Sequence, residues 1–288
     1  MTARNTDGAA TFAIAAVALA AVTFVVAVAT VVRSDGSDAS GTSTSIVVGG
    51  ERVSGAENQD DGEVADPSAT VEEITSQSAA AMGAVTSVEF RLSATGAPIY
   101  IDQFDRIALT SMHGQFAVPG RAQAELAVKI DGNLNTRLGA VAIDDEIWLS
   151  NPVTGDFETL PAGYDIDPSR FFDPVGGWQP LLAGLQQVTL VGVEDRGGQR
   201  YHIRGTATPE QMSNITAGLV GEPQVVIDLW VHPTTFRVTA TEFETSSTTG
   251  TIAWTLDLSS YGEAFQIDPP DNIRTTATTA AAVPTTGA

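Results

Sequence analysis

A series of short segments in the sequence alternates apolar and polar residues, and this two-residue period limits the fold more than any other feature. In residues 122–130, for example, every second position from Ala122 to Ile130 is apolar. Such alternation is typical of a strand with one buried and one solvated face. Turn signals such as Asp131-Gly132-Asn133 separate the segments at short intervals, which favours antiparallel pairing. The expected strands are 88–92, 107–109, 122–130, 134–143, 146–149, 188–193, 201–205, 225–231, 236–240 and 252–258.

Three segments depart from this alternation and are expected to form helices. Asp66-Pro67 and Ser68 offer a cap for the first, and Glu72 and Glu73 follow where the helix dipole favours acids. Pro180 stands where the first turn of the second helix tolerates it. The expected helices run from about 68 to 82, from 180 to 185 and from 208 to about 219.

Ten strands and three helices predict an α+β protein dominated by a long antiparallel sheet. Each strand has one apolar face, and the total apolar area exceeds what three short helices can cover. Either the sheet closes on itself as a barrel, or it leaves a concave hydrophobic trough. The period alone does not choose between these two forms.

The charge balance and the missing cysteine exclude several classes of function. The chain has 14 Lys and Arg against 35 Asp and Glu, a net charge of −21. Nucleic acid is not an expected partner, because phosphate binding needs clustered cations. The absence of cysteine removes disulfides, thiolate metal sites and cysteine nucleophiles.

Residues that could suggest a metal site, a phosphate-binding loop or a catalytic site are interpreted as structural. His113, His202 and His232 are dispersed along the sequence, so they are read as outward strand residues and not as metal ligands. The run Asp144-Asp145-Glu146 is read as turn charge, with weak calcium binding as the alternative. Gly176-Gly177 has no phosphate-loop motif around it. No nucleophile–base pair is suggested, so we expect no cofactor, no metal and no enzymatic activity.

The N-terminal stretch Ala9–Val32 carries no charge and exceeds the roughly 20 apolar residues that a helix needs to span a bilayer. We interpret it as a signal anchor that is retained. The alternative is secretion after cleavage at Ala27-Val28-Ala29, a small-x-small site. In either case the acidic domain that follows is expected outside the cytoplasm.

Composition divides the rest of the chain. Residues 34–66 are rich in Gly, Ser, Asp and Glu and are expected to form a disordered acidic linker. Residues 275–288 are a low-complexity Thr/Ala-rich tail. The predicted organisation is an anchor at 1–33, a linker at 34–66, a folded domain at 67–274 and a tail at 275–288.

Four stretches carry a resemblance to a known family. The stretch "FFDPVGGWQPLLAGLQQVTLVGVEDRGGQRYHIRGTAT" begins at Phe171 with an aromatic pair and Asp173-Pro174, and continues into a leucine-rich helix and a glycine-bearing turn. The other stretches are "SVEFRLSATG" (87–96), "IWLSNPVTGDFETL" (147–160) and "VIDLWVHPTTFRVTATEF" (226–243). In this order they are similar to segments of the mycobacterial LppX/LprAFG lipoproteins, and the likeness spans about Thr70 to Pro269.

This resemblance implies a half-barrel like that of LolA and LolB, in which a strongly curved antiparallel sheet wraps a few helices around a hydrophobic cavity. It also implies the carriage of acylated lipids or glycolipids across the cell envelope, without reaction chemistry. The expected partners are such a lipid, the cytoplasmic membrane through the N-terminal helix, and an envelope transport protein. The chain departs from the family in lacking a cysteine for acylation, so Ala9–Val32 would replace the lipid anchor.

The residues expected to line the cavity are apolar and inward-facing whether they touch lipid or only protein. They are Val88, Phe90, Leu92, Ile107, Leu109, Leu126, Val128, Phe172, Trp178, Leu181, Leu182, Leu185, Leu229, Val238 and Trp254. The leading hypothesis is therefore a membrane-tethered lipid-binding protein. The alternative is an envelope protein-interaction or sensor domain whose core is filled by its own side chains.

Overall fold

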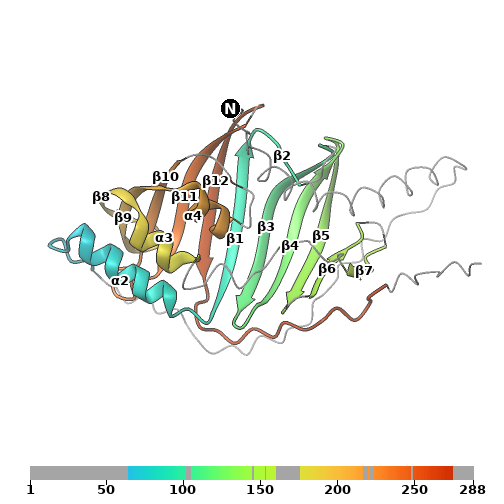
Figure 1. Ribbon diagram of the computed structural model, residues 1–288, viewed down its shortest axis with the longest axis horizontal. Coiled ribbons are helices and arrows are strands. Elements are labelled where there is room, and N and C mark those ends of the chain that lie inside the picture. The colour runs from blue at the N-terminus through green and yellow to red at the C-terminus, as the bar shows by residue number, and fades with distance from the viewer. Residues whose placement is uncertain are drawn as a thin grey trace, which may run out of the picture.

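The structure is a computed structural model that describes residues 64–101, 105–144, 146–152, 154–159, 176–216, 220, 224–247 and 249–274. The predicted anchor, almost all of the predicted linker, the tail, and the residues Phe171, Phe172 and Asp173 lie outside the described residues. The described part contains three helices and a single sheet of 12 strands (Figure 1).

The elements have the following bounds. The strands are β1 (Ser87–Gly96), β2 (Ile99–Tyr100), β3 (Ile107–Ala117), β4 (Arg121–Ile130), β5 (Leu134–Ile143), β6 (Glu146–Ser150), β7 (Phe157–Thr159), β8 (Gln186–Asp195), β9 (Gln199–Ala207), β10 (Val225–Val231), β11 (Val238–Ser247) and β12 (Gly250–Ser259). The helices are α2 (Val71–Gly83), α3 (Trp178–Gly184) and α4 (Pro209–Ile215).

The sheet is open and antiparallel. Its strand order is β7-β6-β5-β4-β3-β1-β12-β11-β10-β9-β8, and β2 adds to β3. Most neighbours are consecutive in sequence, and the exceptions are the two partners of β1. It pairs with β3 and with β12, and the second pairing joins the two ends of the domain. Because β7 and β8 do not pair with each other, the sheet does not close into a barrel. The α+β class and the curved antiparallel sheet are as predicted.

The alternation of apolar residues places one face of each strand in the interior. In β10, Val225, Ile227 and Leu229 are buried. Val226, which lies between the first two of these, is 55% exposed. The pairing places Leu229 opposite Ile203 of β9 and Thr241 of β11. A slip of one residue in this register would turn the buried side chains to solvent.

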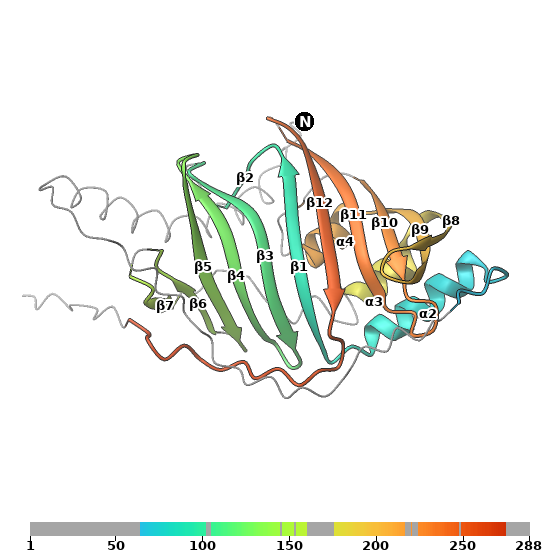
Figure 2. The same cartoon turned by 180° about the vertical axis from the view of Figure 1, so that it is seen from behind.

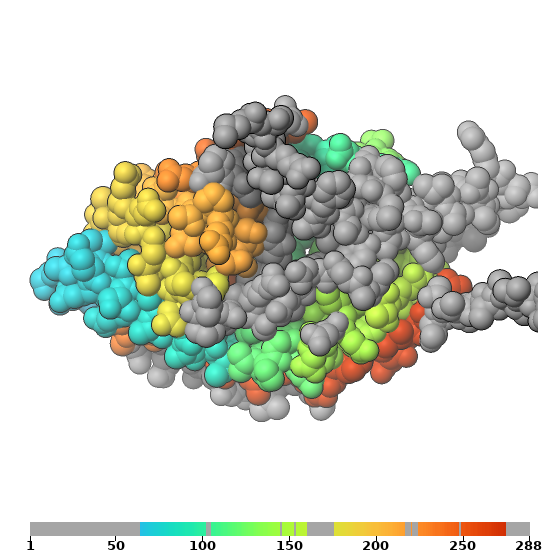
Figure 3. Space-filling model, viewed as in Figure 1, coloured from blue at the N-terminus to red at the C-terminus, as the bar shows by residue number. Residues whose placement is uncertain are grey.

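The three helices lie on the concave face of the sheet, over the half formed by β8–β12 (Figure 1), and Figure 2 shows the same strands in front of them. In Figure 3 the atoms of α2, α3 and α4 cover that half from view. Each helix buries one apolar stripe, which includes Ile74 and Met82 of α2, Leu181 of α3 and Met212 of α4. These side chains belong to the same hydrophobic cluster as the inner residues of β9–β12.

The cap of α2 differs from the prediction. The N-cap is Thr70, whose hydroxyl accepts a hydrogen bond from the Glu73 amide while the Glu73 carboxylate accepts one from the Thr70 amide. This reciprocal capping box satisfies two amides that the first turn leaves without partners. Ser68 instead donates to the Asp66 carboxylate in the preceding turn. The helix therefore begins later than expected, at Val71.

Other boundaries were also wrong. Helix α4 ends at Ile215 and not near Leu219, because the Thr216 hydroxyl bonds back to the Met212 carbonyl and accepts from the Val220 amide. Phe236 was assigned to a strand but has a φ of 54° and lies in the connection before β11. Strands β2 and β7, of two and three residues, are too short to show a period in the sequence.

A C-terminal strap, residues 261–274, crosses the lower end of the sheet from β12 to β7 (Figures 1 and 2). Ile267 of the strap is 2% exposed and packs with Val141 and Trp148 in a second, smaller cluster. By alternation these β5 and β6 residues point away from the concave face. Farther along, the amide and carbonyl of Phe157 in β7 bond to Asn272 and Arg274, so the strap covers the β7 edge.

We predict that Ile267→Ala lowers the free energy of unfolding by about 2–5 kcal/mol, the usual result of deleting a buried branched side chain. The measurement is urea denaturation of the purified protein followed by intrinsic fluorescence. Val226→Ala, at an exposed position, is the control and should change stability by no more than about 0.5 kcal/mol. Equal effects of the two substitutions would show that the strap does not stabilise the sheet.

Candidate functional site

The concave face divides into two halves that differ in how their residues are covered. In the helix-covered half, the predicted cavity residues are fully buried among protein side chains. They are Trp178, Leu181, Leu182, Leu229, Val238 and Trp254. Leu185, which follows α3, is half-buried against the same cluster. This half is packed like an ordinary protein core.

The other half is the inner face of β1, β3, β4 and β5, and none of the three described helices lies over β3, β4 or β5 (Figure 1). The predicted residues of this half belong to the same hydrophobic cluster as those under the helices, with Phe90 and Leu126 only half-buried. They are Val88, Phe90, Leu92, Ile107, Leu109, Leu126 and Val128. The structure therefore brings together all predicted cavity residues except Phe172, which lies outside the described residues.

A row of small residues runs across this second half. Phe90 of β1 is opposite Gly114 of β3, which is opposite Ala124 of β4, which in turn is opposite Ala140 of β5. A Cβ atom at Gly114 would lie 2.7 Å from the Phe90 Cζ atom and 2.9 Å from the Ala124 Cβ atom. The Phe90 ring thus lies over Gly114. We call the inner face of β1, β3, β4 and β5 the low face, because short side chains keep its centre close to the backbone.

The sequence argument missed Gly114, Ala124 and Ala140 as site residues because it selected large apolar side chains. The signal was present in the strand of residues 122–130, where the first two inward positions are alanines and the later ones are larger. On a surface that binds a ligand, small side chains determine the volume left for the ligand as much as the large side chains around it do.

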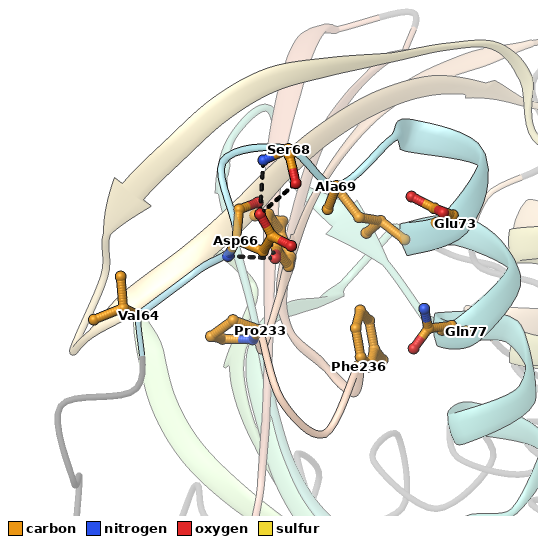
Figure 4. Close-up of a pocket in the computed structure, with 10 residues that line it drawn as sticks. Val64, Asp66, Ser68, Ala69, Glu73, Gln77, Pro233 and Phe236 are labelled. Carbon is orange, nitrogen blue, oxygen red and sulfur yellow. Dashed lines mark hydrogen bonds between the residues drawn. The ribbon is translucent and has the colours of Figure 1, made fainter.

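A pocket of about 370 Å³ lies elsewhere, beside the start of α2 (Figure 4). Ile74, Phe236 and Tyr201 form part of its wall, and Asp66 and Glu73 supply carboxylates. Hydrogen bonds from the Thr70 amide and hydroxyl lower the pKa of Glu73, whereas burial opposes that shift. Both carboxylates hold local turns, and the pocket is separate from the low face.

The outer face of the helix-covered half carries a polar network centred on His202. Its ring nitrogens lie 2.8 Å from a Glu194 oxygen and 2.7 Å from an Asp228 oxygen. The ring stacks on Trp230 at 4.5 Å, and the Arg196 guanidinium lies 4.1 Å from the centre of the Trp230 ring. Hydrogen bonds from Trp230 and His202 lower the pKa of Glu194. The network ties the edge strand β8 to β9 and β10.

The three histidines are separate from one another, as expected, but only two of them lie on strands. His113 is an exposed residue of β3 that bonds to Glu89. His202 faces outward but is buried by its network, and His232 lies in the turn after β10, where it accepts from the Thr234 amide. Within the described ranges, no group of three or more His, Asp or Glu residues is arranged to hold a metal ion.

Comparison with known families decides the identity of the fold. A sequence model of the LppX_LprAFG lipoprotein family matches residues 69–267, more than half of the chain. The chain belongs to this family. The resemblance inferred from the motifs is therefore confirmed.

Two solved structures are similar to this chain. LprF from Mycobacterium bovis has 16% sequence identity and a TM-score of 0.56, over 72% of this chain and 99% of LprF. LppX from Mycobacterium tuberculosis has 16% identity and a TM-score of 0.49, over 69% of this chain and 98% of LppX. No curated protein matches the sequence. The likeness to LprF extends to the curved sheet and its helices.

Membership of a lipoprotein family implies a protein associated with the cell envelope. The described helices are all too short or too polar to cross a bilayer. The predicted anchor Ala9–Val32 lies outside the described residues, so it stays a prediction.

We predict that Gly114→Ala lowers the free energy of unfolding by about 1–3 kcal/mol, as is usual for overpacking. The added methyl group would overlap the Gln123 carbonyl oxygen and crowd the Phe90 ring. The matched control is Gly192→Ala, on a strand with no atom within 4 Å of the added group. It should be neutral within about 0.5 kcal/mol or slightly stabilising, because alanine suits a strand better than glycine. Urea denaturation compares the two, and an equal loss would contradict a crowded low face.

Proposed function

We propose that the protein binds a lipid outside the cytoplasm and that the acyl chains lie along the low face. The observation that carries this proposal is the contrast between the two halves of the concave face. One half is filled by the side chains of α2, α3 and α4. In the other half Leu109 and Val128 are buried, but Phe90, Leu126 and Ala124 are only half-buried, and no described helix lies above β3–β5 (Figure 1).

The chemistry of the low face suits an acyl chain. Burial of a methylene group gains about 0.8 kcal/mol, and the inward residues of β3 and β4 are almost all aliphatic, aromatic or glycine. Apolar contact has no directional requirement, so a chain can slide along such a face without a fixed register. Membership of the LppX/LprAFG family supports the same role, since the family resemblance implies carriage of acylated lipids or glycolipids.

The proposed role has no chemical step, and the expected partners follow from it. An acylated lipid or glycolipid is the ligand, and an envelope transport protein is the source or the recipient. If Ala9–Val32 is retained as an anchor, the protein acts as a tethered acceptor, presenter or sensor, because a spanning helix holds a protein far more firmly than a single acyl chain does.

The alternative function is a non-enzymatic interaction or sensor domain with a self-filled core. The packing of Trp178, Leu181 and Trp254 favours it for the helix-covered half. The two functions differ in a measurable way, because only the first requires an acyl species on the protein.

We predict that Ala124→Trp reduces the acyl lipid that copurifies with the protein. An indole ring on the low face displaces at least two methylene groups of a bound chain, about 1.6 kcal/mol or roughly 15-fold in affinity. The measurement is mass spectrometry of an organic-solvent extract of the protein purified from its native host.

Ala127→Trp is the matched control, because Ala127 lies on the same strand and faces the opposite side, between Ser111 and Arg137. It should leave the lipid content unchanged. The absence of acyl species from the unmodified protein, or an equal loss in both variants, would refute lipid binding on the low face and favour the self-filled domain.

A further inference from the structure

We propose that one end of the sheet docks on the surface of a lipid bilayer. This docking end is formed by β2, the start of β3, the end of β4 and the start of β5, which lie together at the upper end of the sheet in Figures 1 and 2. The proposal rests on the proposed function and extends it, because it identifies the part of the protein through which lipid passes between the bilayer and the low face. Its residues are Tyr100, Ile101, Ile107, Lys129, Ile130 and Leu134.

The inner side of the docking end is a continuous aliphatic row. The Ile101 amide bonds to the Ile107 carbonyl at 2.9 Å, Ile107 pairs with Ile130, and Ile130 pairs with Leu134. Ile107 and Ile130 are buried, but Leu134 is 61% exposed at the tip of the β4–β5 hairpin. The apolar surface of the concave face thus runs to the end of the sheet, where Leu134, the first residue of β5, is exposed.

The outer side of the docking end carries the residue types that prefer a membrane interface. Tyr100 pairs with Ala108, which pairs with Lys129, and Tyr100 is 40% exposed. Tyrosine is enriched at the level of lipid head groups, and lysine extends its ammonium group there. Lys129 is the only lysine of the chain, and it stands one strand position before Ile130.

The described charges of the docking end, Asp105, Arg106, Lys129 and Asp131, sum to zero. Arg106 donates two hydrogen bonds of 2.7 Å to the two oxygens of Asp131, so this acid and this cation neutralise each other. The guanidinium also lowers the pKa of Asp131. A second copy of the chain is a poorer occupant, because among the described residues of the docking end only Tyr100 and Leu134 are exposed large apolar residues, too little surface for a stable dimer.

A bilayer therefore fits the docking end better than a second copy does. Leu134 enters the boundary between head groups and acyl chains, Tyr100 lies at the head-group level, and Lys129 contacts anionic phosphate. Contact at this end places the aliphatic row next to the bilayer interior. Leu109 and Val128, in the next row of the sheet, connect the aliphatic row to the rest of the low face. An acyl chain then moves between bilayer and protein with little exposure to water.

The chain has no cysteine, so a single introduced thiol can be labelled with an environment-sensitive fluorophore. The test uses the full-length variant Leu134→Cys in vesicles of phosphatidylcholine and phosphatidylglycerol, with nitroxide-labelled lipid as the quencher. The matched control is Val226→Cys, 55% exposed on the outer face of β10. Any attachment through Ala9–Val32 is common to both, so their difference reports on the folded domain alone.

We expect a blue-shifted emission and at least about twofold stronger quenching at position 134 than at 226, because an interfacial residue reaches about 5–10 Å into the bilayer. Lys129→Gln should make the docked state about fivefold less populated on the anionic vesicles and leave it unchanged on pure phosphatidylcholine. Equal quenching at the two positions would overturn the proposal.

A second measurement separates this proposal from the proposed function. Leu134→Ser should slow the transfer of a fluorescent phospholipid from vesicles to the protein severalfold and leave the amount bound at saturation unchanged. If no variant ever binds the phospholipid but position 134 is still quenched, the docking stands and the proposed function fails. If transfer is unaffected and position 134 is not quenched, the docking end is refuted and lipid binding stands.

Discussion

The pairing of β1 with β12 is the interaction on which the rest of the domain depends. It joins the first strand to the last and makes two strand groups, β3–β7 and β8–β11, into one continuous sheet. In this pairing Leu92 stands opposite Leu256 and Phe90 opposite Leu258, so both groups present their apolar residues on the same side. One long apolar face results, and only three short helices of the described residues lie against it. Because these helices cover only the β8–β12 half, the two halves of the face differ in how they are covered.

The two halves use different means to stay rigid. The helix-covered half is held from inside by the packing of α2, α3 and α4 and from outside by the network of His202, Trp230 and Arg196. The half that holds the low face has no such inner support from a described helix. Its outer side is held instead by Ile267 of the strap, and the strap also occupies the β7 edge, which would otherwise be free to pair with other chains. Support from the outer side is consistent with the proposal that a ligand binds on the inner side.

Sequence patterns predicted the features that repeat and missed those set by single contacts. Alternation is strong in 122–130 and 225–231, and both segments form strands at those residues or within one of them. Phe236 continues the alternation in sequence, yet its backbone adopts a left-handed turn, which periodicity does not detect. Thr216 ends α4 by a side-chain bond that depends on the fold around it. In the candidate site, the selected large residues other than Phe172 lie in or against one hydrophobic cluster, whereas the space between them depends on Gly114 and Ala124, whose alignment requires the strand register.

The same register links the proposed ligand face to the proposed docking end. Along β4 the inward residues are two alanines, Ala122 and Ala124, and then the larger Leu126, Val128 and Ile130. In β5, Ala142 and Ala140 are paired to the alanines of β4, and Leu134 is paired to Ile130. On β4 and β5 the inward side chains are therefore short near the strap and longer at the hairpin tip, and Phe116 of β3 lies beside Ala122. An acyl chain that enters past Leu134 would descend from bulky residues onto small ones and gain contact area as it goes. Burial then favours entry end-first, while the head group stays near Tyr100 and Lys129, where the polar groups are.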